Sequence, residues 1–152
     1  MPDQDETEEP LQSLPPGMAR GYAEYKPASD RDSTRLTNVG GYDKLLEFCR
    51  AKGLALPRTR QGLAVVDSLI EKAEDRTTLE ALVRPIGMFF GDVLTHALPG
   101  AEWKVIHEDF PEVKIIRNTS VSVIHVARNR LNRGLPTLVM NYDHALDLID
   151  GE

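Results

Sequence analysis

Apolar residues recur with helical spacing along most of the chain from residue 42 onward. The first such stretch runs from Tyr42 to Cys49, and Gly53 follows it, a residue type that often ends a helix in the left-handed conformation. A second stretch covers residues 60–74, where Asp67 is expected on the polar side. The pattern therefore predicts two short helices before residue 75.

The third helical stretch is the most apolar. It is predicted to run from about Thr78 to residue 97, and Thr77 and Glu80 have the spacing of a capping box at its start. Its apolar arc is so wide that the helix is expected to be the centre of the core. Pro85 lies inside this stretch and predicts a kink or a restart of the helix.

The pattern changes to alternation after "LPG" at 98–100. Trp103, Val105 and His107 alternate with polar or exposed positions, and Val113 and Ile115 do so beyond "EDFP". Two strands joined as a hairpin are predicted, and they must lie against the helices, with room for a further strand.

Two more helices are predicted at the end of the chain. The segment 120–134 fits a helix that stops at Gly134, although its β-branched start is also compatible with a strand. Pro136 introduces the last helix, which carries Leu138, Tyr142 and Ile149 on one face. Together these elements predict an α+β fold of about five helices packed around a central helix, with a small antiparallel sheet.

The N-terminal 35 residues have a different character. They are rich in Pro, Ser and acidic residues, lack a sustained period, and carry −4 of the net charge of −6. Such a segment buries too little apolar surface to offset its ordering entropy, so 1–35 is predicted to be mobile and 36–152 to be a single α+β domain.

Composition excludes several classes of protein. The chain has 152 residues, one of them a cysteine, so Cys49 forms no intramolecular disulfide, as expected in a reducing compartment. No apolar run approaches the roughly 18 residues of a membrane span, and the acidic N-terminus is unlike a signal peptide. The nearly neutral remainder argues against nucleic acid as a partner. We expect a cytoplasmic protein without membrane contact.

The pattern "GMFFGDVL", then "W", "PEVKI", "VARNRLNRGLPTL" and "Y" covers roughly Leu79 to Ile149. It resembles an actinobacterial family of small intracellular proteins of unknown function. The resemblance implies an α+β fold and assigns no chemistry.

Gly87 and Gly91 lie one turn apart in the central helix, although glycine costs about 1 kcal/mol there relative to alanine. The first interpretation is close approach of another backbone, from the hairpin or the last helices. The second is a notch for a ligand.

Asp92 and His96 are also one turn apart, at the border of the apolar arc. They are candidates for a base oriented by an acid in a small hydrolase-like enzyme, with His107 as a third member. The alternative is a simple surface pair, since no motif indicates a nucleophile.

Arg128 falls between Ile124 and Leu131 on the apolar side of its helix, and Arg130 and Arg133 are expected to point elsewhere. A guanidinium at the edge of a core needs a partner, for which Asp92 and Glu102 are the candidates. The functional alternative is a site for a small anionic ligand.

No cofactor or metal is predicted. The four histidines, at positions 96, 107, 125 and 144, have no paired-ligand spacing, and no Gly-rich phosphate loop is present. The leading hypothesis is a non-catalytic binding or protein-interaction module, with another protein as the expected partner. The candidate ligand-binding residues are Arg128, Asp92 and His96. Oligomeric state is left open.

Overall fold

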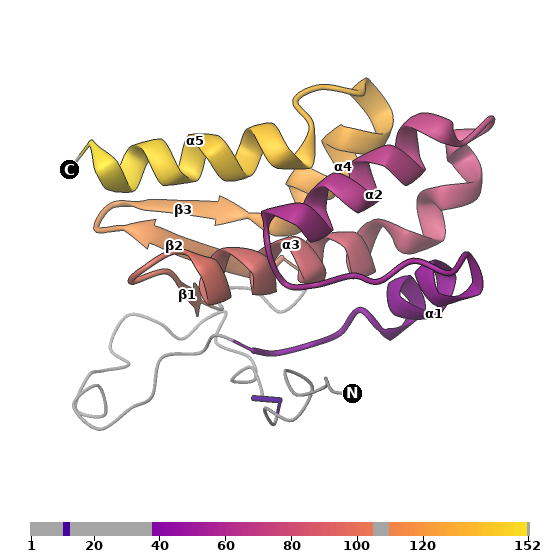
Figure 1. The fold of residues 1–152 in the computed structure, drawn as a ribbon. Helices are drawn as coiled ribbons and strands as arrows, with labels where there is room; N and C mark the ends of the chain where they lie inside the picture. Colours follow the sequence, from indigo (N-terminus) through magenta and orange to yellow (C-terminus); the bar gives the residue numbers. More distant parts are fainter. Residues whose placement is uncertain (1–10, 13–37, 105–109, 152) are drawn as a thin grey trace.

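Three helices run across the molecule, and a small sheet lies alongside the C-terminal one (Figure 1). The structure is a computed structural model that describes residues 11–12, 38–104 and 110–151. The three helices are α2 (Arg60–Lys72), α3 (Val83–Ala97) and α5 (Leu138–Asp150). Helix α2 contacts both of the others. The shorter helices α1 (Asp43–Ala51) and α4 (Val123–Arg133) pack against α3. The predicted α+β class is confirmed.

Helix α3 is the centre of the core. Every residue from 86 to 95 is buried. The helix contacts α1, α2 and α4 as well as the sheet, which explains why its sequence has so little polar surface. The prediction of a central helix is confirmed.

The start of this helix differs from the prediction. A 3-10 helix, η4 (Arg76–Leu82), comes first, and α3 begins only at Val83. Pro85 therefore lies in the first turn, where its missing N–H has no intrahelical partner to lose. The predicted capping box of Thr77 and Glu80 is wrong, because Asp75 caps η4 and accepts hydrogen bonds from both the amide and the hydroxyl of Thr77.

The sheet has three antiparallel strands in the order β1 (Glu102–Lys104), β2 (Glu112–Ile116) and β3 (Thr119–Ser122). Trp103, Val113 and Val121 lie opposite one another and share one face. The predicted hairpin is confirmed in its described part, and the β-branched segment before α4 supplies the third strand. Val105 and His107 lie outside the described residues.

Gly87 and Gly91 allow two neighbours to lie directly on α3. A Cβ atom on Gly87 would be 2.8 Å from the carbonyl oxygen of Val123, at the start of α4. A Cβ atom on Gly91 would overlap the six-membered ring of Trp103. The expectation of close approach is confirmed, and protein atoms fill the space that the alternative reserved for a ligand.

Candidate functional site

Asp92 is fully buried on α3 and anchors a segment from the start of the described domain. Its carboxylate accepts hydrogen bonds from the backbone N–H groups of Val39 and Gly40, each at 3.0 Å. It also accepts one from Nε1 of Trp103 at 2.9 Å. The distant segment at 39–40 and the neighbouring strand β1 therefore meet at one carboxylate of α3.

Burial raises the pKa of Asp92, and the hydrogen bonds from Val39, Gly40, Trp103 and Tyr42 oppose that shift. The pKa of Tyr42 is also raised, by burial and by the neighbouring carboxylate. Because the acceptor positions of Asp92 are used by four donors, the carboxylate holds the fold together and is not available to orient a base.

His96 is exposed near the end of α3 and makes no hydrogen bond with Asp92. The two residues are one turn apart, but one side chain lies in the core and the other in solvent. The structure therefore does not assemble the acid–base pair on which the hydrolase-like hypothesis depended, and His107 lies outside the described residues.

The buried guanidinium of α4 belongs to Arg130, which is 0% exposed. Its Nε donates to Oδ1 of Asp67 at 2.7 Å, and its terminal nitrogens donate to Glu71 and to the carbonyl of Gly134, each at 2.8 Å. Asp67 in turn accepts from the N–H groups of Leu138 and Val139, which begin α5. This cluster joins α2, α4 and α5.

The expectation that Arg128 is the core-edge arginine, paired with Asp92 or Glu102, is wrong. The buried face of α4 is centred on Ala127 and includes Val123, which the prediction treated as possible strand. At about 100° per residue, Arg130 lies about 60° from Ala127 and Arg128 about 100°. Arg128 is exposed and forms no ion pair with a described residue.

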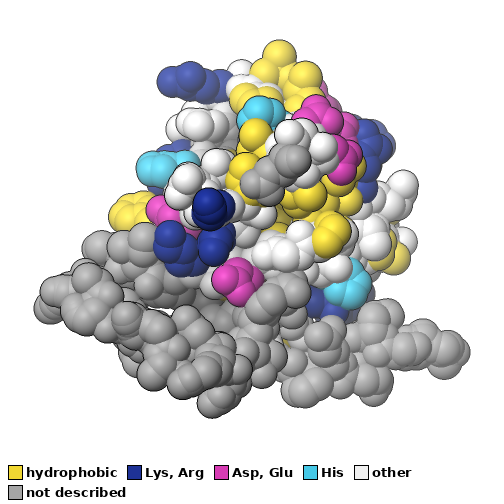
Figure 2. Space-filling view, turned by 90° about the vertical axis from the view of Figure 1, so that its left-hand side faces the viewer, with side chains coloured by type: hydrophobic (Ala, Val, Ile, Leu, Met, Phe, Trp, Pro, Cys, Tyr) yellow, Lys and Arg dark blue, Asp and Glu magenta, His cyan; other side chains and the backbone are white. Residues whose placement is uncertain are grey.

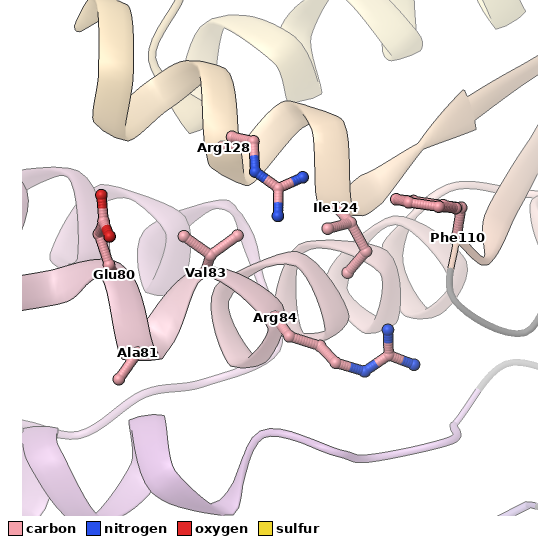
Figure 3. A pocket seen from close by; sticks show the side chains of 7 residues that line it. All are labelled: Glu80, Ala81, Val83, Arg84, Phe110, Ile124 and Arg128. Atoms are coloured by element: carbon pink, nitrogen blue, oxygen red, sulfur yellow. The ribbon is translucent and has the colours of Figure 1, made fainter.

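Arg128 instead lines a surface pocket of about 370 Å³ between η4, the first turn of α3 and the start of α4. The lining residues are Glu80, Ala81, Val83, Arg84, Phe110, Ile124 and Arg128. Figure 3 shows the guanidinium of Arg128 pointing from α4 toward α3, with Arg84 extending from α3 toward the Phe110 end. Glu80 lies at the opposite end of the pocket from Phe110 (Figure 3).

Two guanidinium groups and one carboxylate line the pocket. Its apolar wall is formed by Val83 and Ile124, and Phe110 adds an aromatic edge. The ring of Phe110 stacks on His125, with 5.7 Å between centroids and 16° between planes. The arrangement fits a small ligand with one anionic group, since pockets of a few hundred Å³ take ligands of that size.

Sequence reasoning missed Arg84 and Phe110. Phe110 follows two acids and precedes Pro111 in a polar stretch, and an aromatic residue in such a loop is itself a signal for binding. Arg84 follows Glu80 by one helical turn, on the side of the segment that the apolar pattern leaves polar. No sequence signal places either residue beside Arg128.

Within the described ranges, no three histidine, cysteine or acidic side chains are grouped as a metal site would require. No described helix combines the length and apolar composition needed to cross a bilayer.

The fold and the pocket define a small α+β protein with an arginine-lined cavity on its surface. The chain belongs to the family of unknown function DUF6278, whose model matches residues 19–148. No match was found among curated proteins or among solved structures. The expectation of a family of unknown function is confirmed.

Proposed function

We propose that the protein is a non-catalytic binding module that holds a small anionic ligand at Arg128. The observation that carries the proposal is the position of this side chain: an exposed guanidinium on the wall of a pocket, with Arg84 on the facing helix. Arginine presents a planar fork of donors that matches a carboxylate or a phosphate. Asp92 and His96, the other two candidates, do not line this pocket.

Thermal unfolding in the presence of phosphates, nucleotides and organic acids tests the proposal. A ligand that binds only the folded state adds about 2.7 kcal/mol of stability at a concentration of a hundred times its Kd. We expect at least one anion to raise the Tm, and Arg128→Ala to abolish the rise. Arg133→Ala is the matched control, because Arg133 is exposed on the same helix but does not line the pocket. An equal rise in both variants would contradict the proposal.

A protein partner is the second candidate, favoured by an apolar surface. Figure 2 shows hydrophobic side chains together on the face that carries the end of α5 and the β2–β3 turn. Ile116, Leu148 and Ile149 are half-buried residues of these elements and form what we term the C-terminal patch. A pull-down from the native cell, with the wild type and with Leu148→Asp as baits, tests this second candidate. If Leu148→Asp still retains the partner of the wild type, the C-terminal patch is not the binding surface.

We also propose that the protein works in the cytoplasm of an actinobacterium. The single cysteine, Cys49, is buried and unpaired, which agrees with a reducing compartment.

A further inference from the structure

The pocket at Arg128 contains two kinds of recognition surface, and this inference rests on the function proposed for it. One is cationic, made by Arg128 and Arg84. The other is aromatic, made by Phe110, which lines the pocket, is 41% exposed and stacks on His125. A small ligand that carries an anionic group alone would use only the first.

The aromatic edge is held in place by α4 itself. His125, which backs the ring of Phe110, lies three residues before Arg128 on the same helix. Residues at this spacing are neighbours on a helix surface, about 4.5 Å apart along the axis. The aromatic ring is therefore held beside the helix that carries the guanidinium.

The wall between these two surfaces is apolar. Figure 3 shows Ile124 between Arg128 and Phe110, and Val83 on the Glu80 side of Arg128. An apolar strip that joins an aromatic edge to a charged one matches a planar molecule with an acid at one end. Glu80, at the far end from Phe110, limits the anionic charge that the pocket can accept, because its carboxylate repels a second acid.

From these features we infer that the ligand is a planar ring carrying one anionic group, bound with its ring against Phe110 and its acid at Arg128. Two sources have this chemistry: nucleoside monophosphates and aromatic carboxylic acids. Any nucleobase can stack on an aromatic side chain, because stacking uses the face of the base and not the hydrogen-bonding groups at its edge. The ring supplies affinity through stacking, and the acid supplies orientation.

Isothermal titration of the full chain with matched compounds tests the inference. The ring-plus-acid set is adenosine monophosphate, uridine monophosphate and indole-3-acetate. The acids without a ring are ribose 5-phosphate and acetate, and the ring without an acid is adenosine. We expect at least one ring-plus-acid compound to bind about tenfold or more tightly than the matching acid without a ring, which is ribose 5-phosphate for the nucleotides and acetate for indole-3-acetate. Tighter binding of the nucleotides than of indole-3-acetate then identifies the ligand as a nucleoside monophosphate, and the reverse order identifies it as an aromatic carboxylic acid.

Substitutions at Phe110 separate the ring from the acid. Phe110→Leu should remove the advantage of the ring-plus-acid compound while leaving the affinity for ribose 5-phosphate unchanged, and Phe110→Tyr should retain the advantage. Because Phe110 is 41% exposed, these variants are expected to fold, which circular dichroism checks. Arg128→Ala should weaken binding of both kinds of compound.

Two results would overturn the inference, and they are distinguishable. If acids without a ring bind as tightly as their ring-bearing counterparts, or if Phe110→Leu leaves the difference intact, the aromatic part is wrong and the anion-binding function stands. If no compound binds, or if binding is unaffected by Arg128→Ala, both the inference and the proposed function are wrong.

Discussion

Three buried charged side chains, Asp67, Asp92 and Arg130, each connect segments that are distant in the sequence. Asp92 holds the backbone at Val39 and Gly40 against α3, and Asp67 and Arg130 join three helices. Each charge is satisfied by several hydrogen bonds, as burial requires. A buried ion is costly to bring out of water, so these residues specify where segments meet more than they add to net stability.

Removal of the buried guanidinium should be strongly destabilising. Arg130→Ala leaves the carboxylate of Asp67 without its closest partner and opens a cavity between α2 and α4, and breaking such a pair costs about 3–5 kcal/mol. Arg128→Ala, two residues away and exposed, should change the free energy of unfolding by less than about 0.5 kcal/mol. Urea unfolding of the two variants measures the difference. Equal costs would show that the assignment of the buried residue is wrong.

Acid should weaken the contact between Glu71 and Arg130. The hydrogen bond and charge of Arg130 hold the pKa of Glu71 below its ordinary value of about 4.5. The folded state therefore binds this proton less readily than the unfolded state, and the stabilisation is present above about pH 4.5 and lost as the pH falls through the lowered pKa. As the pH falls below about 4.5, the difference in Tm between the wild type and Glu71→Gln should therefore narrow.

The control for this prediction is Glu74→Gln, which removes an exposed carboxylate that forms no ion pair with a described residue. Its Tm should follow the wild type at every pH. A constant gap between wild type and Glu71→Gln down to strongly acidic pH would contradict the role given to Glu71.

At the level of single residues, the spacing of apolar residues indicated correctly that α4 contains a core arginine, but it pointed to Arg128 instead of Arg130. The apolar positions after Ile124 place Arg128 at the edge of the buried arc. Val123, the residue that shifts the arc toward Arg130, lies at a strand–helix junction that periodicity does not resolve. Asp67 was missed for a related reason: a carboxylate is buried only where distant donors meet it, and those donors are 71 and 72 residues away.

At the level of elements, periodicity predicted the five α-helices of the described residues and the hairpin, because each helix buries one apolar face. It did not predict η4, since a 3-10 segment and the first turn of an α-helix share similar spacing of apolar residues over seven positions. The third strand was only an open possibility, because its residues, Thr119–Ser122, are all half-buried and give no clear alternation.

The contact between α3 and β1 depends on the absence of a side chain at Gly91. Gly91→Ala would gain up to about 1 kcal/mol of helix propensity but would force the ring of Trp103 to move, and overpacking typically costs about 1–3 kcal/mol. We expect net destabilisation in urea unfolding and a shift in the fluorescence of Trp103, the one tryptophan of the chain. Ser68→Ala, at an exposed position of α2, should show neither change. Stabilisation by Gly91→Ala would rule out the tight contact.

At the level of the whole molecule, the described residues of the N-terminal segment, Leu11 and Gln12, contact the start of the region that the structure describes next, at residues 38–40. Gln12 donates to the carbonyl of Asn38 at 2.6 Å, and the side chain of Leu11 lies beside Gly40 while remaining 65% exposed. Leu11 and Gln12 lie outside the family match at 19–148, whereas Asn38 and Gly40 lie inside it. The contacts are made with the segment that Asp92 anchors.

We predict that a chain that begins at Leu36 folds as a single cooperative unit, because the core helix and its neighbours all lie after that residue. Loss of the two hydrogen bonds between Gln12 and Asn38 costs about 1–3 kcal/mol in total, which lowers the midpoint of urea unfolding without changing the character of the transition. The measurement is the m-value, which reports the surface exposed on unfolding. A broad or multiphasic transition would contradict the prediction that 36–152 is a self-sufficient domain.

The carboxylate of Asp67 has a consequence for how the family can vary. It neutralises Arg130 and also caps α5 through the amides of Leu138 and Val139, so neither charged residue can be replaced alone without stranding the other in the core. In members of the family, the residues at positions 67 and 130 should consequently vary together. Both positions should be charged, or both should be apolar. Sequences in which one charge persists while its counterpart is apolar would have to supply a substitute from a neighbouring helix.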